Sequence, residues 1–211
     1  LRKKPEMTAG RSVLELGAGL GLAGFSVVDL AASVTLSDYN EDVLRNLRFN
    51  ATLNFPDAAS RPSVRFLDFH AYREGAIDRR RGRNDGALEE EEEEEEGRMT
   101  TPLPPSDALL PGSETFDVIL GSDIICCEED AWSAAAVIGE KLRPGGVAYL
   151  VLADPRNRYG VEQLPMALKQ QTDLVAEIRK VTEPELLEDV LDEASYLEWN
   201  YFVIRRKVAD Q

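Results

Sequence analysis

Cysteine, histidine and long apolar runs are scarce in this chain, and each scarcity excludes a class of protein. The 211 residues include two cysteines and one histidine. Cys126 and Cys127 are adjacent and cannot join distant segments, which favours a reducing compartment. A lone histidine, His70, predicts no metal site of the zinc type. No apolar run approaches the ~20 residues that span a bilayer, and no signal segment opens the chain. We therefore expect a cytoplasmic protein, or alternatively a nuclear one, without a membrane partner.

Basic residues are outnumbered, with 24 Lys and Arg against 39 Asp and Glu and a net charge of −15. Residues 71–115 carry −7 of this charge, including eight consecutive glutamates at 89–96. Like charges repel and bury nothing, so we predict a disordered, low-complexity insertion over 75–113 within a single domain spanning 1–211. An acidic arm that docks a basic partner is the alternative. The remaining −8 argues against a nucleic-acid partner, which needs a basic face.

Outside that insertion, strand and helix patterns alternate, which predicts an α/β fold with a doubly wound, mostly parallel seven-stranded sheet. Short apolar or β-branched runs predict strands over residues 12–17, 33–38, 63–68, 116–121 and 146–153. Helical patterns occupy residues 21–32, 41–54, 128–142, 161–171 and 184–194. Two late strand patterns, at 173–182 and 195–207, lie so close together that they predict an antiparallel edge that finishes the sheet, with one antiparallel strand.

The most informative stretch is VLELGAGLGLAG, at 13–24, where a strand runs through a glycine-rich turn into a helix. Glycines admit unusual φ values and let a ligand approach the backbone. Two patterns fit this turn. Gly19-x-Gly21-x-x-Gly24 matches the dinucleotide fingerprint of NAD(P)-dependent oxidoreductases. The other pattern is Glu15-x-Gly17-x-Gly19-x-Gly21, and it is favoured because the strand ends directly before Gly17.

The second pattern and three later motifs, in the same order, resemble the class I (seven-β-strand) S-adenosylmethionine-dependent methyltransferases, which have a Rossmann-like fold. Leu-Asp-Phe at 67–69 resembles the family's adenine site. FDVILGSD (116–123) resembles its fourth strand, and LRPGGVAYLV (142–151) resembles the turn into its fifth. The resemblance covers 12–70 and 116–207. It implies a methyltransferase that uses S-adenosyl-L-methionine.

The resemblance also implies which residues bind the cofactor. Asp38 would accept hydrogen bonds from the ribose hydroxyls, although a cap on the helix at 41–54 is an alternative role for it, and Asn40 is the other candidate cap. Asp68 would accept the adenine amine, and Phe69 or Leu67 would cover the ring. The full expected set is Glu15, Gly17, Gly19, Gly21, Asp38, Asp68, Phe69 and Ser122.

Within the class, the details resemble the small intracellular protein-lysine methyltransferases. That group carries Asp-x-x-Tyr after the fourth strand, where this chain has Asp-Ile-Ile-Cys at 123–126. The match implies that Asp123 is catalytic and holds the target amine. A helix cap or a brace for the cofactor are its alternatives. The loop at 153–165 resembles a substrate loop of some members, which implies that Asp154, Arg158 and Tyr159 line the substrate entrance. A plain surface loop is the alternative.

The resulting expectation is an N-methyltransferase that acts as a monomer on a lysine of a protein substrate. A small-molecule amine methyltransferase and a non-catalytic, methyltransferase-like binding module are the main alternatives, and an NAD(P)-dependent oxidoreductase is the least favoured. We expect His70 to be an ordinary polar residue, and Cys126 and Cys127 to be buried filler, because methyl transfer needs no covalent enzyme intermediate.

Overall fold

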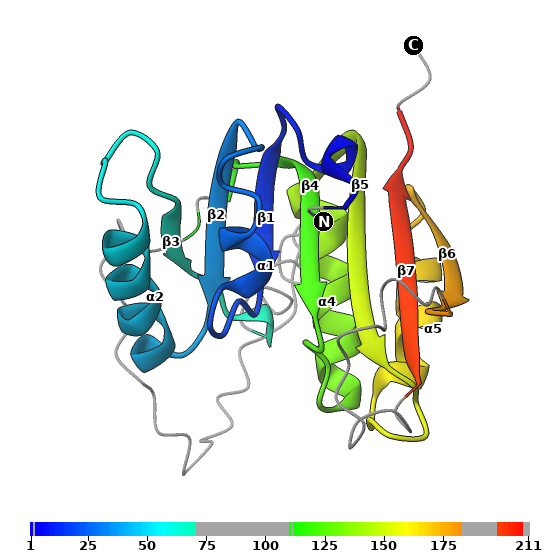
Figure 1. Cartoon of the computed structure of the whole chain (residues 1–211). Coiled ribbons are helices and arrows are strands. Elements are labelled where there is room, and N and C mark those ends of the chain that lie inside the picture. Colours follow the sequence, from blue (N-terminus) through cyan, green and yellow to red (C-terminus); the bar gives the residue numbers. More distant parts are fainter. Residues whose placement is uncertain (2, 71–109, 111, 183–197, 209–211) are drawn as a thin grey trace, which may run out of the picture.

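The computed structural model of the chain describes residues 1, 3–70, 110, 112–182 and 198–208 (Figure 1). The strands are β1 (Ser12–Leu16), β2 (Ser33–Asp38), β3 (Ser63–Phe66), β4 (Phe116–Ser122), β5 (Leu142–Ala153), β6 (Leu174–Lys180) and β7 (Trp199–Arg206). The α-helices are α1 (Leu22–Phe25), α2 (Glu41–Asn54), α4 (Glu128–Lys141) and α5 (Leu164–Gln170), and the short 3-10 helices are η1 (Pro5–Met7) and η2 (Val161–Gln163). No helix among these residues is long and apolar enough to cross a membrane.

The seven strands form one sheet in the order β3-β2-β1-β4-β5-β7-β6. The pairs β1–β2, β1–β4, β2–β3 and β4–β5 are parallel, whereas β7 runs antiparallel to both β5 and β6. The expected α/β class, the mostly parallel sheet and the single antiparallel strand are therefore confirmed. The chain turns from β1 toward β2 on one side and resumes with β4 on the other. The carboxyl ends of β1 and β4 thus flank the position where such sheets bind ligands.

Helices lie on both faces of the sheet, with α1 and α2 on one side and α4 and α5 on the other (Figure 1). Successive residues of one strand point to opposite faces, so each strand feeds two cores. In β4, Ile119 joins the cluster that includes residues of α4 and α5, while Val118 and Leu120 join the cluster that includes residues of α2. Burial of these apolar side chains on both faces is what stabilises the sheet and fixes its loops.

Most expected elements agree with the structure, and the differences have local causes. The predicted helix over 21–32 is wrong in length, because α1 ends at Phe25. There the Ser26 hydroxyl donates to the Ala23 carbonyl at 2.7 Å, and the Val27 N–H bonds the Gly24 carbonyl, which tightens the chain into turns. Residues 26–30 then continue as turns.

Two expectations concern segments outside the described residues. The helix predicted over 184–194 is one, and most of the acidic insertion over 75–113 is the other, so both stay predictions. Within the insertion range, Leu110 is buried, and its N–H donates to the Phe66 carbonyl at 3.1 Å. Close by in sequence, the Gly112 carbonyl accepts a hydrogen bond from the buried Lys141 at 2.9 Å. The chain just before β4 is therefore packed on the domain.

Candidate active site

The glycine turn after β1 is held in a conformation that other residues rarely adopt. Gly17, Gly19 and Gly21 have φ angles of 54°, 53° and 79°, in the left-handed region. A Cβ at Gly21 would lie 2.6 Å from Phe25 and 2.8 Å from Leu47. A Cβ at Gly19 would meet no atom within 4 Å, so the backbone there is open to a ligand. Gly21 thus allows Phe25 and Leu47 to pack closely against the turn, while Gly19 leaves space beside the backbone for a ligand.

Glu15, in β1, stabilises the helix start that follows this turn. Its side chain is buried, and its Oε2 accepts the N–H of Gly24 at 2.8 Å. Burial raises the pKa of Glu15 to about 7, against the opposing effect of the Gly24 and Ala23 N–H groups. Gly24 is a packing residue as well, since a Cβ there would lie 2.3 Å from Leu36 and 2.6 Å from Glu15. Glu15 therefore fastens the start of α1 to β1.

Asp38 lies at the end of β2 and joins two loops of the site. Its Oδ2 accepts the N–H of Gly19 at 3.2 Å, and its Oδ1 accepts the N–H of Asn40 at 3.0 Å. The cap of α2 is Asn40, whose side chain accepts the N–H groups of Asp42 and Val43. Asp38 is thus not the helix cap and remains directed at the glycine turn, as its expected role requires.

The residues after β3 approach the same place. Phe69 packs against the core, and its ring would lie 3.9 Å from a Cβ at Gly17. The Oδ1 of Asp68 accepts the N–H of His70 at 2.9 Å. Nε2 of His70 in turn lies 2.8 Å from Oδ1 of Asp130, in the first turn of α4. The loop after β3 is therefore tied to the start of α4.

Asp123 and Arg158, predicted from separate motifs, meet at the carboxyl end of β4. Nε of Arg158 donates to Oδ1 of Asp123 at 3.2 Å, and its Nη2 pairs with Oδ2. This hydrogen bonding raises the pKa of Arg158. Asp123 has a φ of 52°, unusual for a residue with a side chain. It follows the exposed Ser122, and its N–H is held by the Val151 carbonyl at 2.9 Å.

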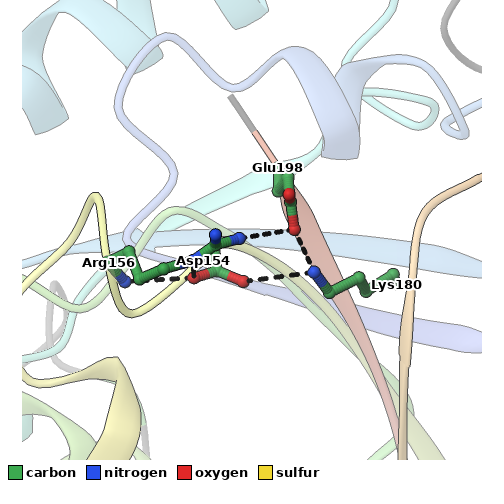
Figure 2. A network of polar contacts seen from close by, with 4 residues as sticks. All are labelled: Asp154, Arg156, Lys180 and Glu198. Carbon is green, nitrogen blue, oxygen red and sulfur yellow. Dashed lines mark hydrogen bonds and ion pairs between the residues drawn. The ribbon is translucent and has the colours of Figure 1, made fainter. Parts of the chain in front are cut away.

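Tyr159 stays near this pair, whereas Asp154 belongs to a different group. The exposed Tyr159 donates its hydroxyl to Glu128 at 3.0 Å, and this bond raises the Tyr159 pKa. Asp154 binds Arg156 at 2.8 Å, and together with Glu198 and Lys180 they form the ion-pair network that Figure 2 shows between the β5 loop and the β6–β7 edge. Arg156 lowers the pKa of Asp154. Asp154 thus braces the loop rather than joining Asp123.

The two cysteines are not buried filler, which corrects that expectation. Cys126 is exposed and Cys127 is half-buried. Cys127 precedes α4 and forms a capping box with Asp130, whose Oδ2 accepts the N–H groups of both cysteines at 2.8 and 3.1 Å. Burial opposes ionisation of Asp130, but the hydrogen bonds from His70 and the cysteines outweigh it and lower the Asp130 pKa. Asp130 therefore holds the backbone of the short segment between β4 and α4.

The structure also places residues at the site that sequence reasoning missed. Ile124 would lie 3.0 Å from a Cβ at Gly17 and 3.0 Å from one at Gly121, so it packs where the β1 and β4 ends meet. Tyr39 is 68% exposed directly after Asp38. An aromatic residue next to the carboxylate expected to bind the ribose is a signal that the sequence contained, whereas the packing of Ile124 depends on the register of two strands.

The residues present fit S-adenosylmethionine. Each oxygen of Asp38 accepts one N–H in this structure, and a carboxylate has about four acceptor positions, so two ribose hydroxyls can still be accepted. Gly19 leaves the backbone accessible, and Phe69 lies beside Gly17 with an apolar ring. These three features are what a nucleoside with two hydroxyls and an aromatic base requires.

Comparison with known proteins agrees with this geometry. A family described as lysine methyltransferase matches residues 2–79. No curated protein matches the chain. Among solved structures, a ribosomal protein L11 methylase from Lactobacillus delbrueckii subsp. bulgaricus has a TM-score of 0.56 at 14% identity, over 98% of this chain and 76% of that one.

Two further solved structures share the fold of this chain, and their names describe different methyltransferases. A methyltransferase from Pyrococcus furiosus has a TM-score of 0.54 at 17% identity, over 96% of this chain and 77% of that one. An arsenic (III) S-adenosylmethionine methyltransferase from Chlamydomonas reinhardtii has a TM-score of 0.54 at 16% identity, over 97% and 66% of the two chains. The expected class I methyltransferase fold is confirmed.

Proposed function

We propose that this protein is an S-adenosylmethionine-dependent methyltransferase that transfers a methyl group to the side-chain amine of a lysine in a protein substrate. The observation that carries the proposal is the position of Asp123. Its carboxylate lies at the carboxyl end of β4, beside the glycine turn, and already holds a side-chain cation, Arg158. A carboxylate that binds a guanidinium in this place is suited to a lysine amine as well.

The cofactor, when bound, supplies an electrophilic methyl group. The residues expected to hold it are Asp38 at the ribose, Asp68 and Phe69 at the base, and the Gly17–Gly21 turn beneath it. The residues of the chain then have two tasks, to position the acceptor amine and to stabilise the positive charge that develops on it. Positioning alone can account for several kcal/mol, with an upper range of about 7–11 kcal/mol.

Asp123 performs both tasks in this account. Its oxygens accept hydrogen bonds from the N–H groups of a neutral amine, which orients the nitrogen lone pair away from the carboxylate. As the nitrogen gains its new bond, the negative carboxylate stabilises the forming ammonium. The amine must first replace Arg158, and this exchange is feasible because the two side chains are 37% and 28% exposed, so that water screens their attraction.

The charge around Asp123 favours a cationic substrate. Glu128 and Glu129 stand in the first turn of α4, and Glu128 is linked to Tyr159 on the neighbouring loop. Glu128 is half-buried and Glu129 is exposed, and carboxylates at a surface attract lysine-rich partners and repel nucleic acid. The protein partner, a cytoplasmic or nuclear setting, and action as a monomer are parts of the same proposal.

The test is methyl transfer from tritiated S-adenosylmethionine into a cell lysate, followed by separation of protein from small molecules. We expect label in protein, and we expect it to vanish when the lysines of the lysate are acetylated beforehand. Label confined to the small-molecule fraction would replace the proposal with a small-molecule amine methyltransferase. Protein label that survives acetylation would exclude lysine as the acceptor.

A further inference from the structure

A cluster of three different donor groups lies beside the proposed active site, and the proposed methyl transfer assigns it no role. The donor atoms are a ring nitrogen of His70, the sulfur of Cys127 and a carboxylate oxygen of Asp130. All three lie within 4.8 Å of one another, and each residue is half-buried. We propose that His70, Cys127 and Asp130 form a zinc-binding site.

The chemistry of the donors selects this ion. Zinc binds imidazole nitrogen, thiolate sulfur and carboxylate oxygen, whereas magnesium and calcium prefer oxygen alone. Around a tetrahedral zinc ion such ligand atoms are separated by about 3.2–3.7 Å. Nε2 of His70 and Oδ1 of Asp130 are 2.8 Å apart, joined by a hydrogen bond. A small rotation of two partly exposed side chains therefore opens enough space for the ion.

The residues around the cluster hold its ligands in place. Oδ2 of Asp130 accepts the N–H groups of Cys126 and Cys127, which leaves Oδ1 as the oxygen that faces the histidine. The backbone of His70 is fixed by its hydrogen bond to Asp68. Metal ligands in proteins are commonly oriented by such outer hydrogen bonds. Two of the three proposed ligands, His70 and Asp130, are therefore already held by hydrogen bonds to neighbouring groups.

The local charge also favours a cation. The carboxylate of Glu129 is hydrogen-bonded to the thiol of Cys127, so a second acid stands next to the three ligands. The two carboxylates offset the positive end of the α4 dipole. Three protein ligands leave a fourth position, which water or the side chain of Glu129 can fill.

A bound zinc ion would connect two loops that border the proposed active site. His70 directly follows Phe69 in the loop after β3, and Cys127 ends the loop that begins with Asp123. The ion would fix the spacing of these loops in place of the single His70–Asp130 hydrogen bond. This proposal differs from the expectation, drawn from the lone histidine, that the chain holds no metal site, and it does not depend on which substrate is methylated.

The experiment titrates the full, untagged chain, freed of metal by a chelator, with zinc chloride in a calorimeter. We expect one zinc ion per chain in the wild type. The control is Cys126→Ser, which removes the neighbouring thiol outside the cluster and should bind zinc equally well. Removal of a residue that hydrogen-bonds a metal ligand, without touching the metal itself, commonly lowers the affinity for the metal about 10–100-fold. Loss of a ligand in Cys127→Ser or His70→Gln should therefore weaken binding by at least about tenfold.

Cobalt chloride gives a second readout, because a thiolate bound to cobalt produces a sulfur-to-metal charge-transfer absorption. That absorption should appear in the wild type and in Cys126→Ser and be absent in Cys127→Ser. The glutamate run at 89–96 is present in every variant, so zinc held there cancels in the comparison. Unchanged binding of S-adenosylhomocysteine verifies that each variant is folded. Absence of zinc binding in the wild type, or equal zinc binding in the wild type and Cys127→Ser, would overturn the proposal.

Discussion

Arg158 holds the carboxylate of Asp123 through both of its oxygens, and the two residues come from different loops, after β5 and β4 respectively. The pair closes the position where the acceptor amine is expected to bind. In the proposed mechanism, Arg158 keeps Asp123 in place until a substrate amine replaces it. Asp123 also has a φ of 52°, and strained backbone of this kind clusters at functional sites.

Replacement of Asp123 by asparagine should reduce turnover while leaving cofactor affinity intact. The amide keeps the shape but loses the charge that stabilises the forming ammonium, and removal of one such electrostatic partner costs about 10²-fold or more in kcat. Steady-state kinetics with a labelled protein substrate and calorimetry with S-adenosylhomocysteine measure the two effects. Asp42→Asn, an exposed acid in the first turn of α2, serves as the control. Unaltered turnover in Asp123→Asn would refute its role.

Replacement of Asp38 by alanine should weaken cofactor binding. The carboxylate is the expected acceptor for the ribose hydroxyls, and hydrogen bonds to a charged group are worth about 1.5–3 kcal/mol each. Calorimetric titration with S-adenosylhomocysteine gives the change in dissociation constant. If Asp38→Ala binds as tightly as the wild type, Asp38 serves the glycine turn only, through its bond to Gly19.

Two glycines of the same turn should respond differently to alanine. Gly19→Ala and Gly21→Ala share the strain of a positive φ, which is about 1 kcal/mol. Only at position 21 does the new methyl group collide with Phe25 and Leu47. We expect Gly21→Ala to lower the free energy of unfolding more, and Gly19→Ala to impair cofactor binding with the smaller loss of stability. Chemical denaturation and calorimetry distinguish the two, and the reverse order would contradict the assignment.

Glu15 should make the stability of the domain depend on pH. Its pKa is about 7 in the folded chain against 4.5 ordinarily, so the folded state holds a proton that the unfolded state releases. The contribution is complete below pH 4.5, is lost as the pH rises from 4.5 to 7, and then levels off, with a slope of up to about 1.4 kcal/mol per pH unit.

The Glu15→Gln variant isolates this effect, because all other titrating groups are the same in both proteins. We expect the free energy of unfolding of the wild type to fall relative to that of Glu15→Gln across this pH window, as measured by denaturant unfolding at several pH values. A difference that stays constant from pH 4.5 to 7.5 would show that Glu15 is not the titrating group.

Periodicity and glycine spacing were sufficient to predict the sheet, its antiparallel strand and the glycine turn, because these depend on local patterns. The helix at Glu41–Asn54 has the predicted bounds, since apolar spacing and an asparagine cap agree. The length of α1 was missed because serine and glycine contacts within one turn ended it. The link between His70 and Asp130 was missed for another reason. It joins residues far apart in sequence, and β2 and β1 lie between β3 and β4 in the sheet, so the contact depends on how the two loops run across the sheet edge.

The central claim is that a methyl group is transferred to protein lysine through Asp123. The most direct test incubates lysate proteins with heavy-methyl S-adenosylmethionine and either the wild type or Asp123→Asn, and then analyses the proteins by mass spectrometry. We predict heavy methyl groups on lysine nitrogen in the wild-type reaction, reduced by about 10²-fold in the variant. Heavy methyl groups on any other residue type, or equal lysine labelling by both proteins, would contradict the account.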